Sequence, residues 1–131
     1  MDRQYRFGLK LLKNRELKPG DAVMFDIDDT IITMMGQAIQ PMIDLVNDAI
    51  YLGYVTVLMT ARPMDEANIK ATMEQLEYFD IPYSHLMFVP AEYKGDAKVK
   101  SGFNYILSVG DMETDLTESE HWINTSTGLF D

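Results

Sequence analysis

The sequence predicts an α/β fold with a parallel sheet of about five strands and helices on both faces. Short apolar runs typical of buried strands lie at 22–27, 54–59, 85–89 and 105–109, and helical patterns separate several of them. Strands that alternate with helices favour parallel pairing through right-handed crossovers, which gives a three-layer, Rossmann-like architecture. With 131 residues, the chain is long enough for one core only.

The helices are predicted from their apolar spacing and from the residues at their ends. Between 40 and 52, apolar residues recur three and four positions apart, Pro41 suits the first helical position, and Gly53 suits a left-handed stop. A second helical pattern opens at Pro63 and ends before Pro82. Both helices are therefore expected to connect consecutive strands.

The last third of the chain contains shorter elements. A segment rich in lysine and glycine precedes the run at 105–109 and is predicted to be a loop, because Gly102 leaves little room for a helix. A short helix near 113–118 and a final strand near 122–124 complete the prediction.

Charge is distributed unevenly along the chain. The formal net charge is −10, yet residues 1–18 hold six bases and only two acids, which leaves −14 on residues 19–131. The turn-forming residues 18–21 separate a basic N-terminal arm (1–18) from the predicted domain (19–131). The arm could bind nucleic acid or an acidic neighbour if it is helical; the alternative is a solvated or frayed terminus.

The chain has no cysteine, which excludes disulfides, thiolate metal sites and a cysteine nucleophile. No apolar run reaches the length of about 18 residues that a membrane span requires. We therefore expect a cytoplasmic protein with no membrane partner, which could form an oligomer.

Acidic residues follow two of the predicted strands. Asp26, Asp28 and Asp29 place three carboxylates within four residues at the end of the first strand. Asp111 and Asp115 follow the run at 105–109. Like charges this close favour a divalent cation, and oxygen ligands without cysteine indicate Mg²⁺ first. A solvated turn with an Asp helix cap is the structural alternative.

These motifs resemble those of the haloacid dehalogenase (HAD) superfamily of phosphatases. The family pattern places Asp-x-Asp-x-Thr after the first strand, Thr or Ser after the second, then a Lys, and a late Gly-Asp-x-x-x-Asp. The matching residues occur here in that order: Asp26, Asp28 and Thr30; Thr60; a lysine within 94–100; Asp111 and Asp115. The resemblance covers residues 22–124 and implies a Mg²⁺-dependent phosphomonoester hydrolase that forms an aspartyl-phosphate.

The resemblance also implies a role for each matching residue. Asp26 would attack phosphorus, and Asp28 would protonate the leaving oxygen and then activate water. Thr60 and the lysine would hold the phosphoryl oxygens, with Thr30 in the substrate site. The metal would be bound by Asp26, the Asp28 carbonyl and Asp111, with Asp115 orienting its waters.

Two assignments stay open at this point. Among Lys94, Lys98 and Lys100, the family pattern of a lysine followed by a small polar residue favours Lys100, with Lys98 as the alternate. Arg62 could contact substrate or pair with a nearby acid.

The spacing between motifs leaves no room for an inserted cap domain, because one helix and one strand fill each interval. By resemblance, a capless site is open and suits a large phosphorylated substrate, such as a polynucleotide end or a phosphoprotein. Two other classes compete with this hypothesis: a phosphoacceptor signalling domain, and a catalytically silent phosphate-binding domain.

Overall fold

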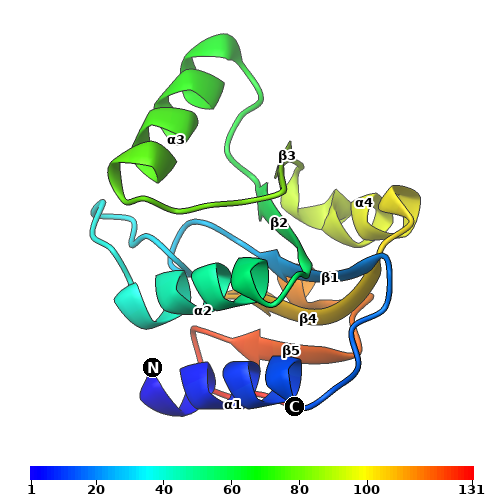
Figure 1. Ribbon diagram of the computed structural model, residues 1–131. Helices are drawn as coiled ribbons and strands as arrows, with labels where there is room; N and C mark the ends of the chain where they lie inside the picture. Colours follow the sequence, from blue (N-terminus) through cyan, green and yellow to red (C-terminus); the bar gives the residue numbers. More distant parts are fainter.

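The computed structural model describes all 131 residues and is built on a five-stranded sheet (Figure 1). The strands lie in the order β3-β2-β1-β4-β5, and every neighbouring pair is parallel. This confirms the predicted fold class. The strands span Asp21–Phe25 (β1), Val55–Thr60 (β2), His85–Phe88 (β3), Asn104–Gly110 (β4) and His121–Asn124 (β5).

Helices cover both faces of this sheet. They span Asp2–Lys13 (α1), Gln40–Tyr51 (α2), Glu66–Tyr78 (α3), Lys94–Ser101 (α4) and Glu113–Leu116 (α5), with a 3₁₀ turn at Ala91–Tyr93 (η1). In Figure 1, α1 lies at the bottom of the molecule and packs against α2, and α3 projects at the top. None of these helices has the length and apolarity needed to cross a membrane.

Alternation along β1 divides the core into two layers. Val23 and Phe25 belong to the larger cluster of 19 buried residues, which includes apolar side chains of α1, α2 and α3. Ala22 and Met24 belong to a smaller cluster on the other face, where Ala97 of α4 packs. Because successive strand residues point to opposite faces, both sides of the sheet must be covered, and the helices do this.

The lysine- and glycine-rich segment forms a helix, α4, so the prediction of a loop there was wrong. Gly102 does not prevent the helix but ends it, in the left-handed conformation with φ +76°. A glycine just past the last helical residue is a common helix stop. This correction matters because α4 carries all three candidate lysines.

The N-terminal segment is packed against the domain rather than frayed. Leu12 of α1 is buried, and its carbonyl accepts a hydrogen bond of 2.8 Å from the hydroxyl of Tyr54. The hydroxyl of Tyr5 donates to Asp48 of α2 at 2.6 Å. The alternative of a solvated terminus is therefore wrong for residues 2–13, while the division at residue 18 stays a prediction.

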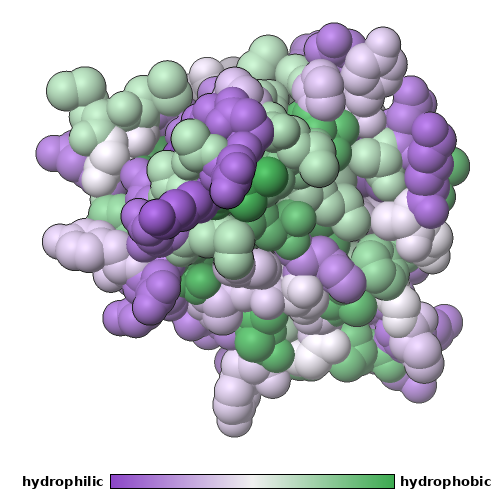
Figure 2. All heavy atoms as spheres, turned by 90° about the horizontal axis from the view of Figure 1, so that it is seen from above, coloured by the Kyte–Doolittle hydropathy of each residue, from purple (hydrophilic) through white to green (hydrophobic).

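Hydrophobic side chains are also found on the surface, chiefly on α3 and on loops. Met73 and Tyr78 of α3 are 49% and 80% exposed. Seen from above, toward α3, hydrophobic and hydrophilic residues are interspersed over the face of the molecule (Figure 2).

Candidate active site

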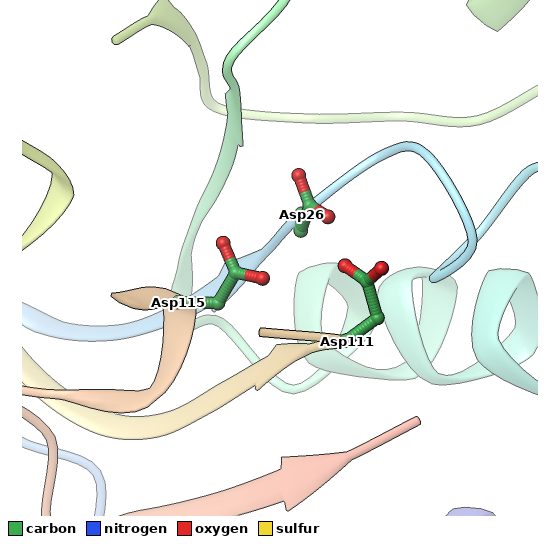
Figure 3. A group of neighbouring side chains, drawn as sticks. All are labelled: Asp26, Asp111 and Asp115. Atoms are coloured by element: carbon green, nitrogen blue, oxygen red, sulfur yellow. The ribbon is translucent and has the colours of Figure 1, made fainter. Parts of the chain in front are cut away.

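Three aspartates converge at the carboxyl ends of β1 and β4. The chain order reverses between these two strands, which is where parallel α/β sheets place their ligands. Asp26 follows β1, Asp111 follows β4, and Asp115 lies on α5. Figure 3 shows their carboxyl groups turned toward a common space, and one oxygen of each lies within 4.8 Å of the others. The structure thus brings together the acids of two separate sequence motifs.

The close approach of α5 to β4 depends on a glycine. A Cβ atom at residue 110 would overlap the side chain of Asp115, so Gly110 allows that carboxylate to lie directly over the strand end. The second oxygen of Asp115 accepts a hydrogen bond of 3.1 Å from the backbone N–H of Met112. These contacts fix Asp115 in a fully buried position.

Lys94 is the lysine that contacts the acidic cluster. Its Nζ lies 2.9 Å from Asp26 Oδ1 and 2.6 Å from Asp115 Oδ1, and the residue is only 2% exposed. Lys100, which the sequence favoured, is exposed on the last turn of α4. The helix explains the error, because a residue six positions further along α4 cannot reach the place of Lys94.

Lys98, the predicted alternate, is buried but does not reach the carboxylates. Its Nζ donates to Ser108 Oγ at 2.9 Å and to the carbonyl oxygens of Asp115 and Thr117 at 2.6 and 2.7 Å. Burial lowers the pKa of Lys98 to about 8. Lys98 therefore holds the segment that carries Asp115 and does not contact the shared space of the three acids.

Burial and like charge perturb the ionisation of the cluster. Burial raises the pKa of Asp26 from 3.8 to about 7, and the charge of Asp115 adds to this against the opposing effect of Lys94. Burial would lower the pKa of Lys94, but the charges of Asp26 and Asp115 outweigh it and raise that pKa. Two of the three carboxylates, those of Asp26 and Asp115, thus share the ammonium group of Lys94.

Arg62 pairs with Asp28. The sequence had left open whether this arginine contacts substrate or pairs with a nearby acid. Its Nη2 lies 2.8 Å from Asp28 Oδ1 and its Nε lies 3.1 Å from Asp28 Oδ2, in the two-pronged geometry typical of arginine and carboxylate. The remaining Nη1 donates to Thr72 of α3 at 3.1 Å. The arginine therefore connects the loop after β1 to α3.

The two predicted threonines are both buried and lie at the strand ends. Thr60 Oγ1 accepts a hydrogen bond of 3.1 Å from the backbone N–H of Arg62. Thr30 Oγ1 lies 3.5 Å from Asp26 Oδ2 and 3.5 Å from the hydroxyl of Thr125, a residue that the sequence analysis missed. Neither threonine is among the residues that line the hollow described next.

A hollow of about 390 Å³ opens above the acidic cluster. Its polar lining comes from charged residues only, and its remaining lining is apolar. The charged residues are Asp26, Asp28, Asp29, Arg62, Lys94 and Asp111, and the apolar ones are Met34, Ala61, Pro63, Ala91 and Met112. None of these apolar residues was assigned a functional role from the sequence. The sequence predicts only that Pro63 starts a helix, and that helix begins at Glu66 instead.

The buried aspartates form a donor set that could hold a metal ion. All of their ligand atoms are carboxylate oxygens, which suit hard divalent cations. The cluster brings three carboxylates together, and Lys94 contacts only two of them, so a bound cation would offset the remaining negative charge. The residues present therefore fit a hard cation at Asp26, Asp111 and Asp115.

Comparison with known proteins supports the fold. No protein-family model and no curated protein sequence matches the chain. A class C acid phosphatase from Bacillus anthracis, solved with tungstate bound, superposes with a TM-score of 0.66 at 19% identity. A chain of the Pnkp1/Rnl/Hen1 complex superposes with a TM-score of 0.57 at 18% identity. The fold is shared.

The comparison covers most of this chain but only part of each neighbour. The alignments include 89% and 77% of this chain, against 65% of the acid phosphatase and 42% of the chain from the complex. The protein therefore spans less than two thirds of either neighbour.

Proposed function

We propose that this protein is a Mg²⁺-dependent phosphomonoester hydrolase of the HAD type that acts through Asp26. The observation that carries the proposal is the convergence of Asp26, Asp111, Asp115 and Lys94 at the point where the strand order reverses. The likeness in fold to an acid phosphatase solved with tungstate bound supports the same reaction class.

In this proposal, a carboxylate oxygen of Asp26 attacks phosphorus, and the bond from phosphorus to the ester oxygen breaks. Lys94 takes the phosphate-binding role that the sequence analysis gave to Lys100 or Lys98, since its Nζ already lies at the attacking carboxylate. A bound Mg²⁺, held by Asp26, Asp111 and Asp115, would offset the negative charge of the acids and the phosphate. Thr30 would orient Asp26 through the contact of 3.5 Å between its hydroxyl and Asp26 Oδ2.

Asp28 is the proposed proton donor to the leaving oxygen. In the structure its carboxylate is held by Arg62, with Nη2 of the arginine 2.8 Å from Asp28 Oδ1. We infer that Arg62 exchanges Asp28 for a phosphoryl oxygen when substrate binds, which frees Asp28 to carry a proton. Asp28 then takes a proton from the water that hydrolyses the aspartyl-phosphate.

Turnover of a generic aryl phosphate tests the proposal. We expect activity with Mg²⁺, loss of activity with a chelator, and loss in Asp26→Asn. Asp96→Asn is the matched control, because Asp96 is an exposed aspartate of α4 outside the hollow. Activity that survives both chelation and Asp26→Asn would exclude this mechanism.

The narrower expectation, a capless enzyme for macromolecular phosphates, rests on the short connections around the hollow. Only residues 26–39 separate β1 from α2, and only residues 61–65 separate β2 from α3. A polynucleotide end is the macromolecular substrate that the sequence favours, but its only support is the set of basic side chains of α1, and none of them lines the hollow. Faster release of phosphate from a 3′-phosphorylated oligonucleotide than from small esters would support it.

The other two classes make different predictions for the same assay. A phosphoacceptor signalling domain would accumulate a long-lived phosphorylated Asp26 without turnover. A silent domain would bind phosphate and hydrolyse nothing.

A cytoplasmic location remains a prediction from the sequence.

A further inference from the structure

The mouth of the hollow, made by its exposed lining residues, carries apolar side chains from separate loops beside the exposed Asp29. Met34 comes from the loop after β1, Pro63 from the loop after β2, and Met112 from the loop after β4. Met34 is 71% exposed and Met112 is 52% exposed, although both are large apolar side chains. Flexible methionines at a binding surface suit apolar groups of varied shape.

The mouth also offers no free positive charge to a ligand. The only cations of the lining are Lys94 and Arg62, and each is already paired with carboxylates of the site. Asp29 and Asp111 line the same hollow and form no ion pair. None of the six bases of residues 1–18 reaches the lining.

We propose that this site takes phosphate monoesters whose leaving group is apolar and carries no second negative charge, such as simple aryl or alkyl phosphates. The inference rests on the proposed function and names its substrate class. Lys94, Arg62 and a bound cation would be committed to the phosphate and the aspartates. A further anion on the leaving group would then face the carboxylate of Asp29, which has no ion pair, with no cation left to pair with. An apolar group would instead bury the exposed methionines and gain from their removal from water.

A matched set of esters tests this preference. Benzyl phosphate, glycerol 3-phosphate and 3-phosphoglycerate all release a primary alcohol, so the set varies polarity and charge while leaving-group reactivity stays similar. We expect kcat/KM for benzyl phosphate to exceed that for 3-phosphoglycerate by about tenfold or more at low salt. The difference in kcat/KM between benzyl phosphate and 3-phosphoglycerate should become smaller at high salt, because salt screens the repulsion between the second anion and the acidic lining.

Variants of the two methionines locate the preference at the mouth. We expect Met34→Ala and Met112→Ala each to lower kcat/KM for benzyl phosphate about threefold to tenfold, with little change for glycerol 3-phosphate. Met73→Ala is the control, because Met73 is a half-exposed methionine of α3 outside the hollow. Met112→Lys should raise kcat/KM for 3-phosphoglycerate by supplying the missing charge.

The outcomes separate the two proposals. Equal kcat/KM for the three esters, or faster turnover of a 3′-phosphorylated oligonucleotide than of benzyl phosphate, would overturn the inference and leave the phosphatase activity intact. Absence of turnover with every ester in the presence of Mg²⁺ would overturn the proposed function and the inference with it.

Discussion

At the scale of single residues, Lys94 is expected to be indispensable, because it is the only cation in contact with both Asp26 and Asp115. We predict that Lys94→Met lowers kcat/KM by about 100-fold or more, the usual cost of losing one charged group that stabilises the transition state. Lys100→Met should leave kcat/KM unchanged, because Lys100 is exposed. Steady-state kinetics measures both, with circular dichroism to confirm folding. Equal losses in the two variants would contradict this placement.

The free energy of unfolding is expected to decrease as pH rises, because of the buried carboxyl group of Asp26. The folded protein raises the pKa of this acid from 3.8 to about 7, so between these values the unfolded chain has lost the proton that the folded chain keeps. Stability should therefore fall with rising pH across this window, by roughly 1.4 kcal/mol per pH unit from this group, and level off above pH 7. Asp26→Asn should remove that slope.

Urea unfolding in a chelating buffer between pH 4.5 and 8 measures the effect of Asp26. The variant should gain most over the parent protein at the alkaline end of this range. Asp96→Asn, which changes an exposed aspartate, should follow the parent protein at every pH. A parallel pair of curves for the parent and Asp26→Asn would show that burial does not perturb this carboxyl group.

At the scale of elements, Lys98 connects α4 to the segment that carries Asp115. Its ammonium group satisfies two backbone carbonyls and the hydroxyl of Ser108. Lys98→Met would leave these buried acceptors without a donor, so we predict a loss of about 2–4 kcal/mol in the free energy of unfolding. Urea denaturation measures it. Lys100→Met on the same helix should change the value by less than about 0.5 kcal/mol.

The elements themselves were largely predictable from local patterns. The helix opened by Pro41 and every strand are present, because apolar spacing and end residues act locally. The helix at 94–101 was not predictable in the same way, since three of its eight residues are lysines and its two buried residues are both lysines. Its stability comes from packing and from Lys94 and Lys98 reaching buried acceptors, which depend on distant parts of the chain.

The site was predictable for the acids and not for the cation. Asp26, Asp111 and Asp115 each follow a strand, and parallel strands bring their ends to one edge, so their convergence follows from topology. To choose among the three lysines, one must know which of them faces the acids on a helix, and the sequence did not predict that helix. The pairing of Arg62 with Asp28 likewise depends on a contact across 34 residues.

At the scale of the whole molecule, the −10 charge bears on stability and on partners at once. Like charges repel in the folded state, and added salt relieves this repulsion without any specific site. Four of the six basic residues of 1–18 lie on α1 and none of the six lines the hollow, so the residues around the hollow are mostly acidic. A specific cation must therefore be distinguished from general screening.

Stabilisation by Mg²⁺ makes this distinction. A cation that binds only the folded protein should raise the free energy of unfolding by about 2.7 kcal/mol when its concentration is 100 times its dissociation constant. Sodium chloride at equal ionic strength gives the screening contribution alone. Asp111→Asn removes one donor and should retain only that contribution, whereas Glu113→Gln, which changes an exposed acid two residues away, should respond like the parent protein.

The extra stabilisation should also be larger at pH 8 than at pH 6, because Mg²⁺ binds the ionised form of Asp26 and the proton competes with it below pH 7. Equal responses of the parent and Asp111→Asn would mean that the three aspartates do not form a metal site.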